Sequence, residues 1–294
     1  MKIVPQALFE LAQAQILLAD GLASVISKKV YQTELEQEKY LAAHAVTVVQ
    51  NGQMRIVSHS GQSTIIGTKQ MVFLPKGLYM ISDILPSNQP FEALIFFFDE
   101  ALIDDYVKMS DWEDYQPTCM PFKVMKRTQS IDTYVDTLIS LYADNSGRHH
   151  SITRSKLLEL LHLISLTEQG RDFGHAIYCI RHKQKQSIKE LMASNFDKPL
   201  AIADYAYLSG RSVSSFHRDF KRLYGQSPKK WLIDQRIQKA IALMNQKEWN
   251  ISSLAFEVGY KNVSHFIAAF RKKIGVSPKQ FHLEKRRKGF IQSI

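Results

Sequence analysis

The sequence predicts an α+β protein with two domains, residues 1–183 and residues 184–294. Residues 40–99 alternate short apolar runs with turn residues, a pattern typical of a small β-barrel or sandwich. Residues 184–294 instead contain two matching helical segments. The charge changes at the same boundary: residues 1–183 hold 17 Lys and Arg against 20 Asp and Glu, whereas residues 184–294 hold 21 against 8. This strongly basic second domain indicates a polyanionic partner.

Strand signals run through residues 40–99. Ala45–Val49 is β-branched, Asn51-Gly52 favours a hairpin turn, and Met54–Val57 alternates beyond that turn. Phe91–Phe98 is a last apolar run. Six or seven strands with this spacing predict a small barrel or sandwich.

The strand region offers few candidate ligand-binding residues. Metal-binding barrels carry a His-x-His pair followed by Glu, whereas His44 and His59 stand fifteen residues apart, so we expect no metal ion and no cofactor. For the aromatic residues of the strands, core packing is favoured over lining a ligand cavity. These residues are Tyr79, Phe91, Phe96, Phe97 and Phe98.

Two apolar stripes at helical spacing follow the strands, in Ile131–Tyr142 and Ser155–Thr167. The second stripe is wide enough both to cover a sheet and to pair with the same helix of another chain. The sequence leaves an intramolecular role and a homodimer contact equally open. Asn145–Ile152, which contains His149 and His150, is expected to be a solvated loop, and residues 182–186 are expected to connect the two domains.

Cysteine usage and hydropathy indicate a cytoplasmic protein without membrane contact. Cys119 and Cys179 have neither metal-site nor disulfide-framework spacing and are expected to be small buried side chains. The apolar run Ala14–Leu18 lacks the basic lead and the cleavage site of a signal peptide. No apolar stretch approaches the roughly twenty residues needed to cross a bilayer.

A repeat is the most informative feature of the second domain. Residues 213–231 recur as residues 263–281 with eight identical positions. The identical pairs are Val213/Val263, Ser214/Ser264, Phe216/Phe266, Phe220/Phe270, Gly225/Gly275, Ser227/Ser277, Pro228/Pro278 and Lys229/Lys279. Two matching helical units in a basic domain suit duplex DNA, which offers the same groove to both.

Capping and breaking residues predict a helix–turn–helix in each copy. In the first copy, a helix over Ala201–Leu208 ends at Ser209-Gly210, and Ser212 caps a helix over Val213–Tyr224. In the second copy, a helix over Ile251–Val258 ends at Gly259, and the next helix begins after Asn262.

Two further helix starts frame the copies. Ser187–Glu190 fits a capping box before the first copy. Pro228 begins a long helix through about Asn245, which spans about 25 Å. This stiff spacer would hold two reading helices about one DNA turn, roughly 34 Å, apart.

Helical periodicity separates core residues from contact residues in the first copy. Val213, Phe216, Phe220 and Leu223 share the side expected to be buried. The opposite side carries the candidate DNA contacts Ser214, His217, Arg218, Lys221 and Arg222. A guanidinium at Arg218 fits guanine O6 and N7, whereas Lys221 and Arg222 are expected at phosphates.

The second copy carries a different reading face. Ala268 stands where the first copy has Arg218, and Ile267 stands where it has His217. These side chains fit thymine methyl groups, a weaker form of readout. The remaining polar candidates are Ser264, His265, Arg271 and Lys272. We therefore predict that the first unit supplies most base discrimination and the second mostly position and affinity.

Residues 187–285 resemble the AraC/XylS family of bacterial transcription regulators. The resemblance rests on the Ser209-Gly210 turn, the Gly-x-Ser-Pro elements at 225–228 and 275–278, Arg236-Ile237 and Val258-Gly259-Tyr260. It implies two helix–turn–helix motifs that bind successive major-groove segments of promoter DNA, usually in activators that contact RNA polymerase. It also implies base-reading roles for Ser214, His217, Arg218, Asn262, Ser264, His265 and Ala268, and a phosphate contact for Arg211.

The strand region, which closes with Phe91–Phe98 and Asp99-Glu100, is similar to cupin-like regulatory domains, and most similar to those of activators of type III secretion and virulence genes. Such domains dimerise and respond to a small-molecule effector or to a protein anti-activator. The residues of the first domain leave both kinds of control open.

Two other function classes remain for comparison. An enzyme is disfavoured because the sequence has no Gly-rich phosphate loop, nucleophile elbow, metal-ligand cluster or paired carboxylates, so no catalytic residue is predicted. A non-specific nucleoid or RNA-binding protein would share a steep salt dependence with a regulator. Only a regulator would show a large ratio of specific to non-specific affinity.

Overall fold

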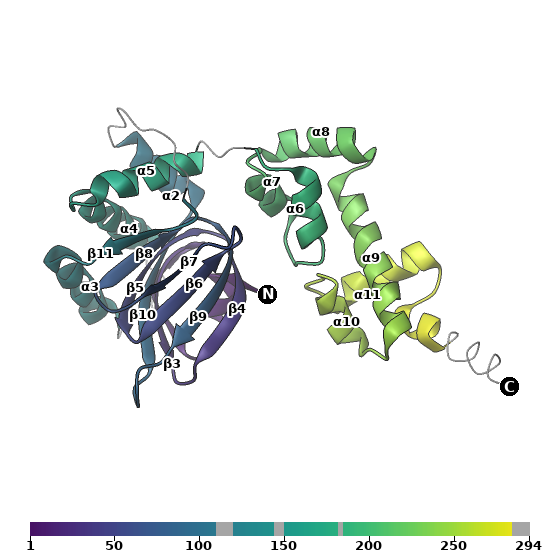
Figure 1. Ribbon diagram of the computed structural model, residues 1–294, viewed down its shortest axis with the longest axis horizontal. Coiled ribbons are helices and arrows are strands. Elements are labelled where there is room, and N and C mark those ends of the chain that lie inside the picture. The colour runs from purple at the N-terminus through teal and green to yellow at the C-terminus, as the bar shows by residue number, and fades with distance from the viewer. Residues whose placement is uncertain (110–119, 144–149, 182–184, 284–294) are drawn as a thin grey trace. The chain divides into compact units, whose positions relative to one another are not determined.

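The computed structural model describes residues 1–109, 120–143, 150–181 and 185–283 (Figure 1). The chain divides into two compact units, Met1–Lys183 and Gln184–Ile294. The first unit combines sheets and helices, whereas the described part of the second is helical. The predicted α+β class is confirmed.

Two β-sheets form the centre of the first unit. One has five strands in the order β1-β4-β9-β6-β7, and the other has six in the order β11-β8-β5-β10-β3-β2. Both sheets end in edge strands, so the arrangement is an open, cupin-like sandwich rather than a closed barrel. The strands are β1 Lys2–Val4, β2 Ala14–Asp20, β3 Ala23–Val30, β4 Glu34–Leu41, β5 His44–Asn51, β6 Gln53–Ser58, β7 Ser63–Ile66, β8 Gln70–Leu74, β9 Gly77–Ile84, β10 Phe91–Phe98 and β11 Lys123–Lys126.

The alternation of side chains along β10 shows why this unit has two cores. Phe91 and Phe97 point into the core between the sheets, while Phe96 and Phe98 point into the core on the other face of the six-stranded sheet. Both faces of β10 are therefore buried, which explains its nearly continuous apolar sequence. The expectation that the aromatic residues of this region pack in a core agrees with this arrangement.

Helices cover the second face of the six-stranded sheet (Figure 1). Four of them contribute to this core: α2 Glu100–Lys108, α3 Gln129–Tyr142, α4 His150–Ser165 and α5 Gly170–Arg181. The short helix α1, Gln6–Phe9, packs beside the core between the sheets. In α4, the wide apolar stripe mostly serves the intramolecular core, since Leu157, Leu160 and Leu161 are completely buried there.

The hairpin prediction at Asn51-Gly52 is wrong. β5 and β6 flank this dipeptide, but β5 pairs with β8 and β10, whereas β6 pairs with β7 and β9. The chain crosses here from one sheet to the other. Gly52 has a φ of 85°, and a Cβ at this position would lie 2.6 Å from the carbonyl oxygen of Ile84. Glycine is thus needed for a sheet-to-sheet corner rather than for a hairpin.

Other boundaries in the first unit also differ from prediction. Six strands lie within residues 40–99 as expected, but β1, β2, β3 and β11 lie outside that range, and β4 begins before it. The apolar run expected not to be a signal peptide forms β2. Helices α2 and α5 were not predicted, and α4 begins at His150, within the segment expected to be a loop. Cys179 is buried, whereas Cys119, His149 and residues 182–184 lie outside the described residues.

Besides helical residues 278–283, the described part of the second unit contains six helices, and they form two helix–turn–helix units in sequence (Figure 1). They are α6 Ile188–Asn195, α7 Ile202–Leu208, α8 Val213–Tyr224, α9 Pro228–Gln246, α10 Ile251–Glu257 and α11 Val263–Ile274. Side-chain oxygens of Ser187, Ser212, Ser227 and Asn262 accept hydrogen bonds from the first turns of α6, α8, α9 and α11. The predicted helix boundaries are therefore confirmed to within about two residues.

The buried side of α8 is narrower than predicted. Phe216 and Phe220 are fully buried, as are Phe266 and Phe270. Val213 and Leu223, expected on the buried side, are each 45% exposed. The rings of Tyr224 and Trp231 pack against Phe220 at 4.5 and 5.8 Å between centroids, so aromatic rings rather than the aliphatic residues fill this side.

No helix within the described ranges is both long enough and apolar enough to span a lipid bilayer.

Candidate nucleic-acid interface

A tight turn places α8 on the surface of the first helix–turn–helix. Gly210 adopts a φ of 68°, which closes the end of α7. The amide of Gly210 donates to the carbonyl of Tyr207 at 3.0 Å, and the amide of Arg211 donates to that of Ala206 at 3.0 Å. Ser212 then caps α8 by accepting from the amide of Ser215 at 3.2 Å. Local chain chemistry therefore fixes the direction in which α8 begins.

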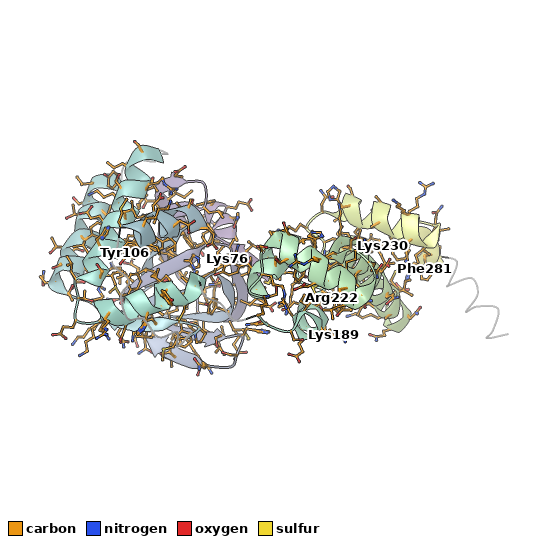
Figure 2. The ribbon with its side chains drawn as sticks, turned by 90° about the horizontal axis from the view of Figure 1, so that it is seen from above. Lys76, Tyr106, Lys189, Arg222, Lys230 and Phe281 are labelled. Carbon is orange, nitrogen blue, oxygen red and sulfur yellow. The ribbon has the colours of Figure 1, made fainter. Side chains whose placement is uncertain are left out.

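The exposed face of α8 carries the predicted contact residues. Ser214, His217, Arg218, Lys221 and Arg222 are all exposed, opposite the buried Phe216 and Phe220. The side chains of Arg218 and Arg222 are 77% and 79% exposed (Arg222 is labelled in Figure 2). This face can approach the floor of a groove because its guanidinium groups reach into solvent.

Arg211 is placed differently from the other candidates. Its side chain is only 12% exposed, and its Nε lies 3.1 Å from a carboxylate oxygen of Asp219. Its Nη1 donates to the carbonyls of Gln186 and Ser209, at 2.8 Å each. The guanidinium therefore ties the turn to α8 and to the start of α6, and its predicted contact with a phosphate has no support from this placement.

Asp219 is an interface residue that the sequence did not single out. The hydrogen bond from Arg211 holds the pKa of Asp219 below its usual range, and the charges of Arg222 and Arg218 act in the same direction. Its other carboxylate oxygen lies 3.5 Å from Arg222 and 3.9 Å from Arg218. The signal in the sequence was a lone acid in a basic helix, three residues before Arg222.

The second helix–turn–helix presents α11 in the same way but with a different surface. Ser264, His265, Ile267, Ala268, Arg271 and Lys272 are exposed on it. The Asn262 side chain caps the helix, since its Oδ1 accepts from the amides of Ser264 and His265 at 2.8 and 3.2 Å. A shallow hollow lies over Ala268, lined also by Ser264, Ile267, Arg271, Lys272 and Gly275. This surface offers a methyl group where α8 offers a guanidinium.

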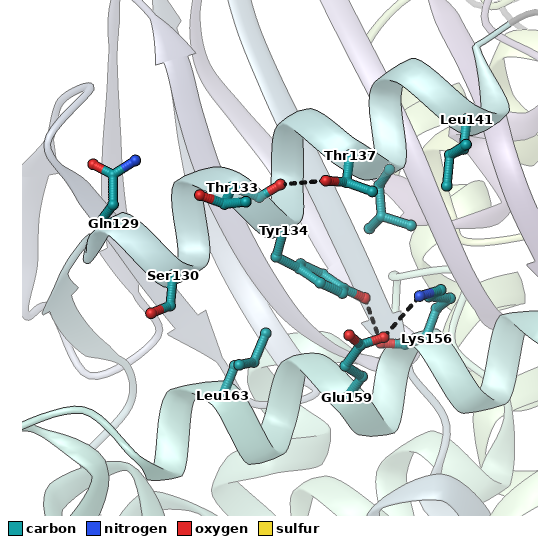
Figure 3. Close-up of a pocket in the computed structure, with 10 residues that line it drawn as sticks. Gln129, Ser130, Thr133, Tyr134, Thr137, Leu141, Lys156, Glu159 and Leu163 are labelled. Carbon is teal, nitrogen blue, oxygen red and sulfur yellow. Dashed lines mark hydrogen bonds and ion pairs between the residues drawn. The ribbon is translucent and has the colours of Figure 1, made fainter.

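A groove in the first unit lies between α3 and α4 (Figure 3). Its volume is about 450 Å³, and its floor includes Tyr134, whose hydroxyl donates to the carbonyl of Lys156. Lys156 and Glu159 form an ion pair of 2.9 Å along its rim, and Leu141 is exposed at its end (Figure 3). The groove combines apolar side chains with a pair of opposite charges.

Charged side chains are also buried between the two sheets. Asp83 forms ion pairs with Lys28 and, at 3.4 Å, with Lys39, beside a cavity of about 40 Å³ lined mainly by apolar residues. Burial lowers the pKa of Lys39 to about 8. Burial alone would raise the pKa of Asp83, but the charges of Lys39 and Lys28 outweigh it and leave that pKa below its usual range. These three groups satisfy one another within the sandwich.

His44 and His59, the two histidines weighed as metal ligands, lie in different environments. His44 is buried, with its Nδ1 accepting from the amide of Lys76 at 3.0 Å, whereas His59 is exposed. Within the part of the chain that the structure describes, no three His, Cys, Asp or Glu side chains are grouped in a way that could hold a metal ion.

Two protein-family models match the chain. The model described as a helix-turn-helix domain matches residues 205–284, and the model described as the ExsA N-terminal regulatory domain matches residues 44–176. The chain belongs to the AraC family of transcription regulators. Members of this family bind promoter DNA and are not enzymes, which confirms the prediction that this AraC-type regulator is not one.

Two relatives are similar over most of this regulator, and a third over less than half of it. The thermoregulatory protein LcrF of Yersinia pestis is 22% identical over 231 residues, which cover 77% of this chain and 84% of LcrF. The virulence regulon transcriptional activator VirF of Yersinia enterocolitica is 22% identical over 232 residues, with the same coverage of both chains. The transcriptional regulator ExsA of Pseudomonas aeruginosa is 24% identical over 123 residues, 42% of this chain and 44% of ExsA.

Solved structures are similar to this regulator at low identity. An apo form of ToxT from Vibrio cholerae, which carries a single substitution, is 13% identical, covers 88% of this regulator and 96% of its own chain, and has a TM-score of 0.46. The DNA-binding domain of the global transcriptional factor AdpA, in complex with a target DNA, is 24% identical and covers 34% of this regulator and 94% of its own chain, with a TM-score of 0.33.

Proposed function

We propose that this AraC-type regulator activates transcription by binding a promoter site with α8 in one major groove and α11 in the next. The repeated exposed helix carries this proposal. α8 and α11 are each twelve residues long, each begins at a side-chain cap and ends at a glycine, and each turns its phenylalanines inward and its basic residues outward. One DNA-binding surface is thus present twice on one compact unit.

In the first helix–turn–helix unit, Arg218 is the principal base-reading residue. Its exposed guanidinium can donate two parallel hydrogen bonds to guanine O6 and N7. Ser214 and His217, on the same exposed face, are the neighbouring base contacts. Lys221 and Arg222 stand toward the end of α8 and contact phosphates. Arg211 supports this surface from inside, through Asp219 and the turn.

In the second helix–turn–helix unit, the readout of bases is weaker and more apolar. Ile267 and Ala268 contact thymine methyl groups, with Ser264 and His265 as polar neighbours on the same face. Arg271 and Lys272 contact phosphates. Asn262 caps α11 with its carbonyl oxygen, so its contribution to DNA binding is chiefly to orient the helix start.

We propose that the sheet-containing unit, Met1–Lys183, controls the helical unit, Gln184–Ile294, and joins two copies of the chain. The groove between α3 and α4 is the surface that fits a second copy, because Leu141 is exposed there beside the opposite charges of Lys156 and Glu159. A Leu141→Glu variant should sediment as a monomer at concentrations where the wild type dimerises. Tyr31→Glu, a change at a similarly exposed position outside the groove, should leave the dimer intact.

Partners outside the chain follow from an activator role. RNA polymerase is the partner that an activator must reach, and the bacterial cytoplasm is where promoter DNA and polymerase meet. The signal that reaches the sheet-containing unit is a small-molecule effector or a protein anti-activator. Transcription from a selected site by purified polymerase, with and without the regulator, tests the sign of regulation.

Selection from a pool of random DNA duplexes tests the DNA-binding proposal. The full chain should enrich a discrete site, protect about two helical turns of it per protomer, and bind it at least about 1,000-fold more tightly than unrelated duplex. Lys221→Ala should weaken binding to all sequences and reduce the salt dependence, while Arg218→Ala should relax one position of the site. A ratio of specific to non-specific affinity near one would instead support a nucleoid or RNA-binding protein.

A further inference from the structure

A contact outside the spacer helix joins the two helix–turn–helix units. The loop Phe196–Lys198 follows α6 and leads to α7, so it belongs to the first helix–turn–helix unit. It packs against the middle of α9 and against the turn between α10 and α11, which belongs to the second unit. We define Phe196–Lys198, Arg236, Lys239, Gly259 and Tyr260 as the joint.

Arg236 occupies the centre of the joint. Its Nε donates to the carbonyl of Phe196 at 2.7 Å, and its Nη2 donates to the carbonyl of Lys198 at 2.7 Å. The same guanidinium lies over the ring of Tyr260, 5.6 Å from its centroid. The edge of this guanidinium therefore donates hydrogen bonds to a loop of the first helix–turn–helix unit, while its face stacks on a ring of the second.

Gly259 allows the two units to approach closely. Its φ is 88°, and a Cβ built on it would lie 2.6 Å from the carbonyl oxygen of Asp197 and 3.1 Å from Nε of Arg236. No side chain fits in that space without moving the loop. The backbone of the first helix–turn–helix unit is thus in direct contact with the turn of the second helix–turn–helix unit.

Lys239 adds a charged contact one turn after Arg236. Its Nζ lies 2.6 Å from a carboxylate oxygen of Asp197 and 3.9 Å from one of Glu257, at the end of α10. The side chain of Lys239 is partly buried in both ion pairs. The loop of the first unit is consequently attached to α9 at two successive positions.

A second attachment changes what α9 can determine. A helix of 19 residues, about 28 Å long, fixes a distance. Its start is attached to the first helix–turn–helix unit by the connection at Gly225-Gln226-Ser227 and by Trp231, whose ring packs on those of Phe220 and Tyr224. Contacts at the joint attach that unit to α9 a second time, further along the helix, and limit its rotation about the helix start. Because one added base pair turns the next groove by about 35° around the DNA axis, rotation is what a DNA site would sense.

We propose that the joint makes this regulator specific for the number of base pairs between its two half-sites, with Arg236 and Gly259 as positioning residues that touch no DNA. This inference rests on the proposed function. It adds a specificity that neither α8 nor α11 carries, since either helix could still read its own half-site if the joint were open.

The main experiment uses the duplex selected by the full chain, with one base pair inserted or deleted between the two half-sites. Wild-type affinity should fall about tenfold or more on either change, since the second helix then loses its contacts. Arg236→Ala should bind the original duplex more weakly and should lower the penalty for the changed duplexes to about threefold or less. Arg236→Lys, which keeps the charge but loses the paired hydrogen bonds, should fall between them.

Two further variants control this result. Arg218→Ala should weaken binding to all three duplexes and leave the spacing penalty at its wild-type value, because it changes a reading residue and not the joint. Gly259→Ala should reduce the penalty as Arg236→Ala does, by pushing Asp197 away, and it guards against misfolding specific to the arginine variant. An unchanged penalty in Arg236→Ala and Gly259→Ala would overturn the inference.

A measurement without DNA separates this inference from the proposed function. Spin labels at Lys221→Cys on α8 and Lys272→Cys on α11, with Cys119 and Cys179 replaced by Ser, report the distance between the two helices. A narrow distance distribution that broadens in Arg236→Ala supports the joint even where no selected site is found. Equal widths in both proteins contradict it whatever the DNA result.

Discussion

The two helix–turn–helix units share a backbone plan but stabilise it differently. In both, a glycine with positive φ closes the first helix, and the next residue donates its amide five residues back, from Arg211 to Ala206 and from Tyr260 to Ala255. In the first unit that residue is Arg211, which binds Asp219 within the same unit. In the second it is Tyr260, whose ring receives Arg236 at the joint. At this position the first helix–turn–helix unit makes a contact within itself, and the second makes one at the joint with the first.

The turns also differ in length, and the reading faces differ in chemistry. α7 ends at Leu208 and α8 begins at Val213, whereas α10 ends at Glu257 and α11 begins at Val263, so the second turn is one residue longer. On α8 the exposed face contains Arg218 with the acid Asp219 beside it, while α11 has Ala268 and Ala269 at those places. A duplicated scaffold has thus kept its frame while its two DNA-facing surfaces have diverged.

The largest expected effect tests whether each unit keeps its own core. Phe216→Ala and Phe266→Ala each remove a fully buried ring and should cost about 3–5 kcal/mol of unfolding free energy. In urea, fluorescence of Trp231, which packs on Phe220, should report the first loss, and that of Trp249, which packs on the second core, should report the other. Identical unfolding curves at both tryptophans in both variants would show that the two units unfold as one.

A smaller effect tests the divergence of the reading faces. Arg218→Ala should cost about 1–3 kcal/mol of discrimination at one base pair of the first half-site. Ala268→Arg should create a comparable new preference in the second half-site, where the wild type has little. Affinities for single-base variants of the selected duplex measure both. Equal loss of base preference at both half-sites in Arg218→Ala would defeat the assignment of discrimination to the first unit.

Helix caps provide a comparison of about 1 kcal/mol. Asn262→Ala removes an acceptor of two amides and Ser212→Ala an acceptor of one, so the first should destabilise its unit at least as much as the second. Thermal unfolding measures both, and Ser214→Ala, an exposed change without a cap role, should leave stability unchanged. Should Asn262→Ala keep its stability but lose DNA affinity, Asn262 would be a base contact rather than a cap.

The smallest expected effect concerns pH and the charge of Asp219. Because the pKa of Asp219 is lowered in the folded state, its contribution to stability is present above the unfolded pKa of about 4 and is lost as pH falls through the lower folded value. Asp219→Asn should therefore flatten the loss of stability of the first helix–turn–helix unit as pH falls below about 4. Trp231 fluorescence in urea measures it, and the second unit, with Ala269 in this place, serves as the internal reference.

Local chemistry explains why the second domain was predicted well. Ser212, Asn262, Gly225 and Pro228 act on the amides and carbonyls within a few residues of themselves, so their sequence spacing is enough to set the ends of α8, α9 and α11. The repeat then identified the paired units, and the exposed positions of α8 followed from helical periodicity. Only the edge residues Val213 and Leu223 were placed on the wrong side, because neighbouring aromatic rings decide how wide the buried face is.

Non-local partners explain the failures in the first domain. Asn51-Gly52 has the composition of a hairpin, yet the strands on its two sides pair in different sheets. Strand pairing depends on which distant segment offers a matching apolar face, and a turn dipeptide carries no information about that segment. The strands before residue 40 were missed for the same reason, since Lys28 and Lys39 stand in β3 and β4 and pair with Asp83 of distant β9.

By itself the sequence determined the two-domain organisation of charge, the duplicated helix–turn–helix and the helix ends, because those properties depend on composition and on neighbours along the chain. Tertiary structure alone decided the roles of the arginines. Arg211, Arg218 and Arg236 carry the same side chain. Arg211 forms an ion pair with Asp219, Arg218 faces solvent, and Arg236 bridges the two helix–turn–helix units. A guanidinium acquires its role from the acceptors that folding brings within about 3 Å of it, and those acceptors are up to 40 residues away in the chain.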